Sequence, residues 1–359
     1  MRPQGSPTIR DVAKHAGVSV ATVSHVLQGK SSLHAAATVE RVRRSAEELS
    51  YRPNRTAQNL ARRQTRTLGV VVETMTTGRF TANAFCVEVL DGILDFAGEA
   101  DYQVKIVSLK CNDSQTVAQC VDNGSMDAAA LIAPNSDGAL VAWAQTAALP
   151  IVLVGSLPDG IDIPRVDVDD EAAILNAVRW LTELGHRHIG IITGPPTQWS
   201  AVRRENAYAR ALASAGLEAI ASLRYAGDYT YASGQAGAAE LMTADPRPTA
   251  IICGNDGVAV GALEALHRLH IRVPDEVSIL GFDDHDVARW CRPQLTTIRQ
   301  PFHEMGVKAA ELLITAIEGG PVLRKEPIIF PGVLVRRRST APPPGLSAPR
   351  GARRGGSVP

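Results

Sequence analysis

The chain has 359 residues, of which 45% are hydrophobic and 21% charged, so it is long enough for two or three domains and apolar enough to bury a core. No apolar run approaches the roughly 20 residues of a membrane-spanning helix, and the first residues lack the apolar block of a secretory signal, so we expect a cytoplasmic protein without a membrane partner. The five cysteines are odd in number and scattered, which excludes a disulfide framework and a cysteine-rich zinc site.

Charge is distributed unevenly along the chain, although its 37 basic and 37 acidic residues cancel. Residues 1–66 carry twelve Lys and Arg against four acids, and residues 336–359 carry six Arg and no acid. The 269 residues between them hold 19 bases and 33 acids. This asymmetry favours a basic head that binds nucleic acid and an acidic body. A solvated basic face would carry the same charge.

The first fifty residues predict three short amphipathic helices. Thr8 and Asp11 are spaced as in a capping box, and apolar residues recur behind them at helical intervals. Gly17 ends this helix, and Ser19 can cap a second one. A third apolar stripe begins after Thr38. Two helices joined by a glycine-containing turn and closed by a third indicate a helix-turn-helix unit.

The second helix would turn small and polar side chains away from the core. Ala21, Ser24, His25 and Gln28 lie on this face. Such side chains fit against base edges in a major groove, and His25 and Gln28 can hydrogen-bond there. An ordinary three-helix bundle is the alternative, but the basic charge and the small outward face favour DNA.

Residues 51–63 read Y-R-P-N-R-T-A-Q-N-L-A-R-R and predict a short basic helix that begins near Pro53. A helix this short is marginal alone and should order only against a partner. Leu60 could wedge between base steps from the minor groove while the neighbouring arginines contact phosphates. A flexible linker is the simpler alternative.

Between residues 67 and 335 the pattern alternates between strands and helices. The short apolar runs are 68–72, 104–108, 128–133 and 151–154, then 189–193, 223–225, 250–253 and 277–282. Two series of about four buried strands predict two doubly wound lobes with parallel sheets. No glycine-rich phosphate-binding loop follows any of these runs, so we expect no nucleotide cofactor.

Ligands of doubly wound sheets bind at the carboxyl ends of the strands. At those ends this chain places arginines, carboxylates, an amide and aromatic side chains. Together they could hold a small polyhydroxylated or heterocyclic ligand. The D-D-H-D run at 283–286 and the histidines of G-H-R-H at 185–188 are better explained as loop and strand residues than as metal ligands, so we expect no metal.

The segment T-I-R-D-V-A-K-H-A-G-V-S-V-A-T-V-S-H-V-L (8–27), followed by Y-R-P-N and A-x-x-L (51–60), resembles the headpiece and hinge of the LacI/GalR family of bacterial transcription regulators. In the body, G-H-R-H-I-G (185–190), R-P-T-A-I-I-C-G-N-D (247–256) and V-P-D-E-V-S-I-L-G-F-D-D (273–284) extend the resemblance over roughly residues 8–335. It implies an α/β protein with an N-terminal helix-turn-helix headpiece and a two-lobed body like that of periplasmic binding proteins.

The resemblance implies four segments. They are the headpiece at 8–52, a hinge helix and linker at 53–66 and the two-lobed body at 67–335; the fourth is a tail at 339–359, which its Pro-, Gly-, Arg- and Ser-rich composition predicts to be disordered. Within the body, the N-lobe is expected at about 67–165 plus 298–326, and the C-lobe at about 166–297 plus 327–335.

The resemblance also implies site residues. Those expected to contact DNA are Thr8, Ser19, Val20, Ala21, Thr22, Ser24, His25, Asn54, Arg55, Ala57 and Leu60. Val20, Ala21 and His25 would read bases, and Leu60 would intercalate. Those expected to bind an effector are Phe85, Cys86, Gln198, Ser200, Arg204, Tyr229, Asn255 and Asp283. Gln198 stands where purine-binding relatives carry an arginine, which argues against a purine, whereas the pair of Arg204 and Asp283 fits a sugar or a nucleoside.

Two departures from the family pattern affect these expectations. The segment 29–37 is about one residue longer than usual, which leaves open what its residues contact. Gly155-Ser156 replaces the common Asp-Arg or Asp-Trp beside the expected effector site.

We therefore expect a sequence-specific transcriptional regulator, most simply a repressor, that binds a palindromic operator in the nucleoid as a homodimer. A small sugar-like or nucleoside-like effector would control it, and it would not be an enzyme. Two alternatives remain at this stage: a sugar-binding receptor of the periplasmic type, and an enzyme acting on a small carbohydrate in the same cleft.

Overall fold

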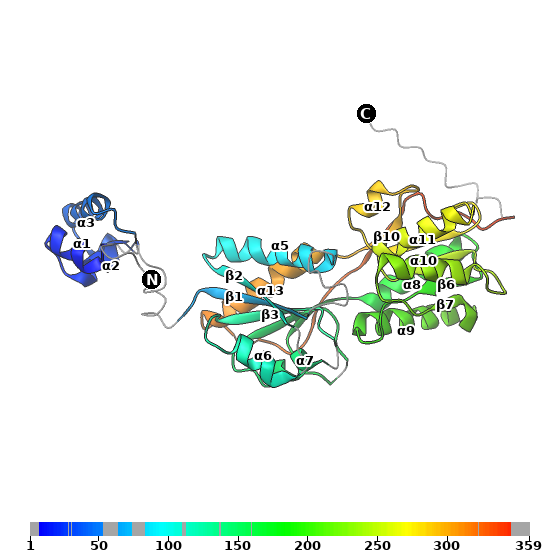
Figure 1. The fold of residues 1–359 in the computed structure, drawn as a ribbon, viewed down its shortest axis with the longest axis horizontal. Coiled ribbons are helices and arrows are strands. Elements are labelled where there is room, and N and C mark those ends of the chain that lie inside the picture. The colour runs from blue at the N-terminus through cyan, green and yellow to red at the C-terminus, as the bar shows by residue number, and fades with distance from the viewer. Residues whose placement is uncertain are drawn as a thin grey trace, which may run out of the picture. The chain divides into compact units, whose positions relative to one another are not determined.

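The computed structural model describes residues 7–27, 29, 31–52, 64–73, 83–109, 113–135, 138–158, 160–321 and 323–345. The chain divides into two compact units, Met1–Thr65 and Arg66–Pro359 (Figure 1). No helix among the described residues is both long and apolar enough to span a bilayer. The predicted hinge residues, Asn54, Arg55, Ala57 and Leu60, lie outside the described residues.

The first unit contains the three predicted helices, α1 (Ile9–Ala16), α2 (Val20–Leu27) and α3 (Ala36–Glu48), with a short 3₁₀ turn η1 (Ser31–Leu33) before α3. The capping box is present, because the Thr8 amide donates to Asp11 Oδ2 at 2.7 Å and the Asp11 amide donates to Thr8 Oγ1 at 3.4 Å. Gly17 ends α1 with φ 62°, a left-handed conformation that costs glycine little. The three apolar stripes meet in one small core.

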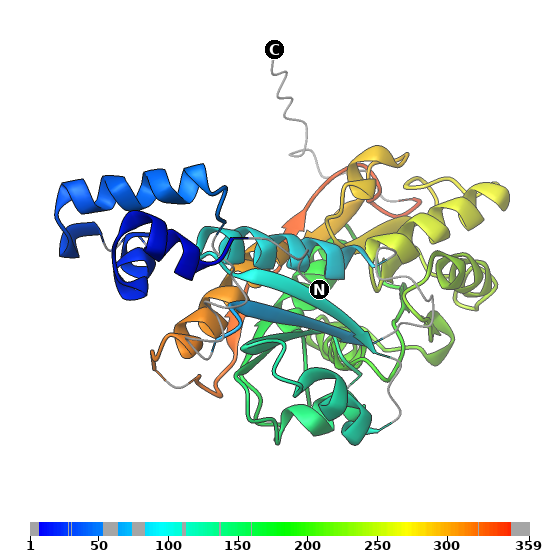
Figure 2. The same cartoon turned by 60° about the vertical axis from the view of Figure 1, so that its left-hand side comes forward.

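The second unit consists of two lobes, each built on a six-stranded sheet. The N-lobe sheet has the order β11-β5-β4-β3-β1-β2 and is parallel throughout. Its strands are β1 (Thr67–Glu73), β2 (Gln103–Leu109), β3 (Ala128–Ile132), β4 (Ile151–Val154), β5 (Arg165–Val168) and β11 (Ile328–Phe330). In Figure 2, β1 and β2 run beside each other across the view as the blue and cyan arrows.

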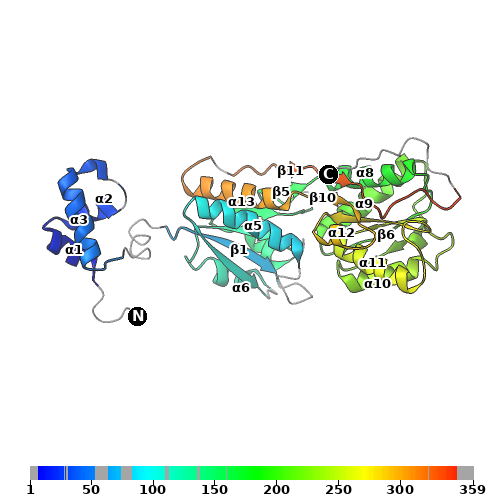
Figure 3. The ribbon, with the colours of Figure 1, turned by 90° about the horizontal axis from the view of Figure 1, so that it is seen from above.

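Helices cover both faces of the N-lobe sheet. On one face α5 (Ala84–Glu99) and α13 (Phe302–Ile317) lie side by side, as Figure 3 shows. On the other face α6 (Ser114–Val121) and α7 (Ala139–Ala144) bury a second core. The sheet is therefore buried on both sides, as the continuous apolar runs of its central strands predicted.

The C-lobe repeats this plan with the strand order β12-β10-β9-β8-β6-β7. Its strands are β6 (Ile189–Ile192), β7 (Arg224–Tyr225), β8 (Ala250–Cys253), β9 (Ser278–Asp283), β10 (Thr296–Arg299) and β12 (Val333–Val335). Only β12 is antiparallel to its neighbour. One face is covered by α8 (Asp170–Glu183) and α9 (Trp199–Ser214), and the other by α10 (Tyr231–Leu241) and α11 (Asp256–Arg268). The short η3 (Ala221–Leu223) and α12 (Val287–Trp290) complete the lobe.

The predicted fold class, a helix-turn-helix headpiece and a two-lobed α/β body, is thus confirmed, but the lobe boundaries need correction. β5 and β11 belong to the N-lobe sheet and β10 to the C-lobe sheet. The chain therefore crosses between the lobes after Val168, after Arg299 and after Phe330 rather than near 165, 298 and 327. These strands are only three or four residues long, so their periodicity is too short to be recognised.

The expectation that residues 339–359 are disordered is wrong for 339–345. Ser339 is completely buried, and its Oγ accepts from the Thr296 amide at 2.8 Å and donates to the Ile279 carbonyl at 2.6 Å. His186 reaches the Ala341 carbonyl through Nε2 at 2.9 Å, and burial lowers the pKa of His186 to about 4. The segment thus satisfies polar groups at the beginnings of β9 and β10, two inner strands of the C-lobe sheet, which a Pro- and Arg-rich composition does not reveal.

We predict that ending the chain after Arg338 lowers the free energy of unfolding by about 2–4 kcal/mol, because buried partners of Ser339 and Ala341 lose their hydrogen bonds. Urea unfolding followed by circular dichroism measures this loss. Ending the chain after Gly345 instead should leave the unfolding midpoint unchanged. Equal midpoints for the two truncations would contradict a structural role for 339–345.

Candidate functional site

Helix α2 presents the expected small and polar face to solvent. Val20 is 42% exposed, Ala21 is exposed, and Thr22, Ser24 and His25 are half-buried. Ser19 stands before the helix and accepts the Thr22 amide through Oγ at 3.1 Å. The exposed Val20 methyl groups suit contact with the methyl group of thymine, although single exposed apolar side chains also occur elsewhere on this chain. Thr8 is already engaged in capping α1.

The long segment 29–37 places a second histidine against this face. The rings of His25 and His34 stack with centroids 5.5 Å apart, and His34 Nε2 lies 3.4 Å from His25 Nδ1. Because that contact occupies His25 Nδ1, the other ring nitrogen, Nε2, is the one left to face a base edge. The sequence motif did not identify His34, since segments of variable length carry no fixed spacing to α2.

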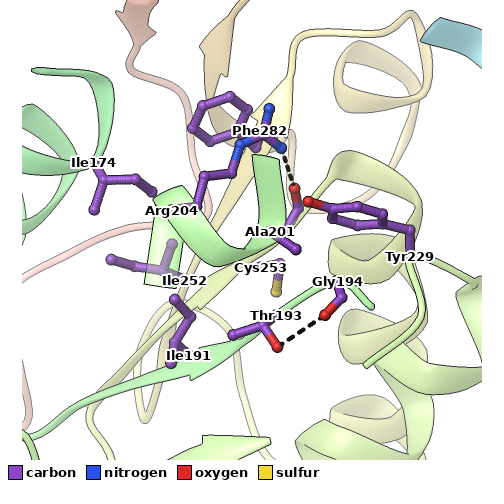
Figure 4. Close-up of a pocket in the computed structure, with 11 residues that line it drawn as sticks. Ile174, Ile191, Thr193, Gly194, Ala201, Arg204, Tyr229, Ile252, Cys253 and Phe282 are labelled. Carbon is purple, nitrogen blue, oxygen red and sulfur yellow. Dashed lines mark hydrogen bonds between the residues drawn. The ribbon is translucent and has the colours of Figure 1, made fainter. Parts of the chain in front are cut away.

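In the body, Arg204 on α9 lies beneath the ends of the C-lobe strands. Its Nε donates to Asp170 Oδ1 at 2.8 Å, its Nη1 donates to the Gly254 carbonyl at 2.9 Å, and its guanidinium lies 3.7 Å from the centre of the Phe282 ring. Burial alone would lower the pKa of Arg204, but the Asp170 charge raises it above its ordinary value. Figure 4 shows Arg204 extended along Phe282 and toward Tyr229.

Tyr229 closes the same pocket. Its ring lies so close to Gly194 and Gly254 that a side chain on either glycine would collide with it. Its hydroxyl lies 3.4 Å from Ser200 Oγ, and burial raises the pKa of the phenol. Tyr229 has φ 66°, a conformation that non-glycine residues adopt mainly at turns or functional sites. The rest of the lining comes from the C-lobe and is mostly apolar, with Thr193, whose hydroxyl donates to the Gly194 carbonyl, as its other polar side chain (Figure 4).

Asn255 and Asp283 stand at the next two strand ends. Asn255 caps α11 by accepting the Val258 amide at 2.7 Å and donates through Nδ2 to the Tyr229 carbonyl at 3.1 Å. The Asn255 side chain is therefore already used in two structural hydrogen bonds, and the predicted contact with an effector would have to share these atoms. Asp283 has φ 126° and accepts from Gln300 Nε2 at 2.7 Å, so its backbone is held in a strained conformation.

The other predicted effector residues lie in different surroundings. Gln198 is half-buried at the start of α9 and makes no side-chain cap there. Phe85, in the first turn of α5, packs edge-on against Phe302 with ring centres 5.0 Å apart. Cys86 is 2% exposed within the N-lobe core, and burial raises its pKa to about 12. Cys86 therefore offers a ligand almost no surface, because the helix turns it toward the sheet.

Sequence reasoning missed a second charged group, which joins the two lobes. Arg203 of α9 donates through Nη1 to Asp167 Oδ2 at 2.5 Å and through Nη2 to the Val168 carbonyl at 3.2 Å, both on β5 of the N-lobe. Ser156, after β4, donates to Asp167 Oδ1 at 2.9 Å. Burial raises the pKa of Asp167, although Arg203 opposes this shift. Asp167 lies on β5, the short strand that the periodicity did not show.

Arg203 and Arg204 are therefore each paired with a buried carboxylate, Asp167 and Asp170 respectively. Within the part of the chain that the structure describes, no group of three or more His, Cys, Asp or Glu side chains is arranged to hold a metal ion. The cleft presents guanidinium and carboxylate groups, a tyrosine hydroxyl and a phenylalanine face, which suits hydrogen bonding to a small polar ligand.

Comparisons with known proteins agree for both units. Residues 8–54 match the family of bacterial regulatory proteins, lacI family, and residues 178–340 match the periplasmic binding protein-like domain. The chain is 33% identical to catabolite control protein A of Priestia megaterium, an alignment that covers 85% of this chain and 91% of that protein. The lac repressor dimer bound to operator and the anti-inducer ONPF superposes with a TM-score of 0.82 at 28% identity, covering 93% of this chain and 99% of that one. A CelR–cellobiose complex does so with a TM-score of 0.72 at 30% identity and the same coverage.

We predict that Arg204→Met lowers the free energy of unfolding by about 3 kcal/mol, because the buried Asp170 carboxylate loses its closest cation and keeps only Ser156 at 3.4 Å and Arg203 at 3.9 Å. Adding Asp170→Asn to this variant should recover part of the loss. The exposed pair Arg210–Glu171 is the matched control, since Arg210→Met should cost less than about 1 kcal/mol. Additive effects of the two substitutions at 204 and 170 would contradict the pairing.

Proposed function

The chain belongs to the lacI family of bacterial regulatory proteins, and from this we propose that it is a repressor that binds a palindromic operator as a homodimer and responds to an uncharged sugar-like or nucleoside-like effector. It is a DNA-binding transcriptional regulator by family, and its relatives are regulators rather than enzymes. We place it in the cytoplasm, on the nucleoid.

The DNA-reading part of the proposal is supported by the outward face of α2. In each protomer α2 would enter the major groove of one half-site, with Val20, Ala21 and His25 against base edges. A homodimer with two-fold symmetry requires two such half-sites in inverted order, which is a palindrome. The twelve basic residues among the first 66 would supply the phosphate contacts that position the helix.

The hinge part of the proposal depends on residues 53–63. We expect them to form a helix only on operator DNA, where Leu60 would open a pyrimidine–purine step from the minor groove. Asn54, Arg55 and Ala57 would then lie along the same groove. A change in the angle between the lobes would alter the stability of this marginal helix and hence the affinity for DNA. To change the ratio of the two lobe arrangements from 99:1 to 1:99, the effector must bind one arrangement more tightly than the other by about 5.5 kcal/mol.

The effector class follows from the charge of the cleft. Arg203 and Arg204, the arginines that α9 brings to the described part of the cleft, are both neutralised by buried aspartates. A phosphate or carboxylate ligand would have to break one of these pairs, whereas hydroxyl groups can share them. Asp283, Ser200 and Tyr229 add further polar atoms, and Phe282 adds an aromatic face. The similar CelR structure is a complex with cellobiose, which agrees with a neutral sugar.

One observation carries the proposal: a helix-turn-helix unit with an outward-facing reading helix is joined in one chain to a cleft whose charges are paired. The cleft alone would fit a sugar-binding receptor of the periplasmic type, but such a receptor has no use for the headpiece.

The direct test is to select bound sequences from random duplex DNA with the full chain, and then to footprint the selected site with a panel of sugars, nucleosides and the matching sugar phosphates. We expect protection of an approximate palindrome, released by an uncharged compound but not by its phosphate. Selection of no common sequence would overturn the regulator, and release only by a phosphorylated compound would overturn the effector class.

We further predict that Leu60→Ala weakens binding to the selected operator at least tenfold, a loss of about 1.4 kcal/mol, because the wedge between base steps is removed. Binding to unrelated DNA should change less than about twofold, since phosphate contacts dominate there. Gln58→Ala is the neighbouring control. Fluorescence anisotropy at one fixed salt concentration measures both affinities, and equal losses on the two DNAs would argue against a wedge.

A further inference from the structure

His285 lies between two carboxylates that belong to opposite lobes. Its Nε2 is 3.3 Å from Asp283 Oδ2 at the end of β9 in the C-lobe. Its Nδ1 is 2.6 Å from Glu88 Oε1 on α5 in the N-lobe. The His285 side chain is only 12% exposed, whereas that of Glu88 is 45% exposed. One buried imidazole thus joins the proposed effector aspartate to the other lobe.

The surrounding groups hold this ring in place. The His285 amide donates to Asp256 Oδ2 at 2.9 Å, which fixes its backbone to the start of α11. The ring lies 5.4 Å from the centre of Phe302, the first residue of α13 in the N-lobe, and Phe302 in turn contacts Phe85 of α5. Asp256 is fully buried in the C-lobe and Phe302 is fully buried in the N-lobe. Each of these contacts of His285 therefore moves only when its lobe moves.

The two contacts require a charged ring. Carboxylates accept hydrogen bonds and do not donate them, so both imidazole nitrogens must carry a proton to bond Asp283 and Glu88 together. Burial alone would lower the pKa of His285, but the Asp283 and Glu88 carboxylates raise it to about 10. The ring therefore keeps both protons at neutral pH. The charged ring forms one ion pair with Asp283 of the C-lobe and another with Glu88 of the N-lobe.

We propose that His285 is a positioning residue that couples capture of an effector at Asp283 to the contact between the lobes. The inference rests on the proposed role of Asp283 as an effector-binding residue. Asp283 Oδ1 accepts from Gln300 and Oδ2 faces His285, so a ligand hydroxyl that bonds Oδ2 would share this oxygen with the His285 ring. A hydroxyl that donates to Oδ2 competes with the His285 ring for this oxygen. This competition changes the strength of the hydrogen bond between the ring and Glu88. Because Glu88 is half exposed, that hydrogen bond can break and re-form.

The chain contains a matched control for this bridge. His303 of α13 bonds Asp95 of α5 through Nε2 at 2.9 Å, so a histidine meets a carboxylate on α5, the helix that also carries Glu88. Both of these residues lie in the N-lobe and are exposed, His303 at 49% and Asp95 at 70%. Removing Asp95 therefore deletes a histidine–carboxylate pair without touching the contact between lobes.

The first test measures hydrogen exchange in the full chain without ligand, at the α5 amides 87–90. Glu88→Gln and Asp283→Asn should each reduce the protection of these amides roughly threefold to tenfold, although Asp283 lies in the other lobe. The double variant should lose less protection than the product of the two single losses, because the two side chains are coupled. Asp95→Asn should leave these amides unchanged. In a His285→Gln background the coupling between positions 88 and 283 should vanish.

The second test follows the ring itself by NMR of the chain labelled with ¹⁵N-histidine. One imidazole should stay doubly protonated at pH 8 and be absent in His285→Gln. The pKa of this ring should fall toward the ordinary value of histidine in Glu88→Gln and in Asp283→Asn. It should not change in Asp95→Asn. A ring that only fills space would show no such shift.

The inference is overturned if Asp283→Asn leaves the α5 amides protected, or if the coupling persists without His285. Operator binding by the same variants separates this failure from failure of the proposed function. A chain that selects no operator refutes the regulator, whereas a chain that binds its operator but lacks the coupling refutes only the role of His285.

Discussion

The site depends on the requirement that a buried charge have a partner of opposite charge. Arg204 is almost fully buried, and it meets this requirement by bonding Asp170 at the start of α8 and the Gly254 carbonyl at the end of β8. A single guanidinium therefore sets the positions of α8, α9 and a strand end relative to one another. Phe282 and Tyr229 pack around this charge, and the shape of the pocket follows from the pairing rather than from the apolar core beneath it.

The same requirement shapes the contact between the lobes. Arg203 with Asp167 and His285 with Glu88 are charged pairs whose members come from different lobes. The interiors of the lobes are apolar, whereas these contacts between lobes are polar, and Glu88 in one of them is 45% exposed. Apolar cores resist rearrangement, and removing Arg203 from the buried Asp167 would cost about 3–5 kcal/mol, whereas Glu88 is 45% exposed and can exchange its contact with His285 for water at a smaller cost. A rigid lobe joined to another by such pairs suits a protein whose two states must be close in free energy.

The sequence predicted the local features well. The capping box of Thr8 and Asp11, the turn at Gly17 and the continuous apolar runs of the central strands are all set by residues a few positions apart. Of the predicted effector residues, Arg204 on α9 bonds the Gly254 carbonyl just after β8, Tyr229 lies in the loop after β7, and Asp283 is the last residue of β9. Cys86 belongs to the core instead, because a one-residue step along a helix turns a side chain by about 100° and decides which face it occupies.

Local pattern was thus enough for the helices, the central strands and the order of the domains, since these follow from the periodicity and capping of neighbouring residues. It was not enough for contacts between residues that lie far apart along the chain. Ser339 meets Ile279 and Glu88 meets His285 because of how the elements pack, and such a hydrogen bond leaves no trace in the spacing of its two partners. The short edge strands and the charged bridge between the lobes became visible only when those distant partners were brought together.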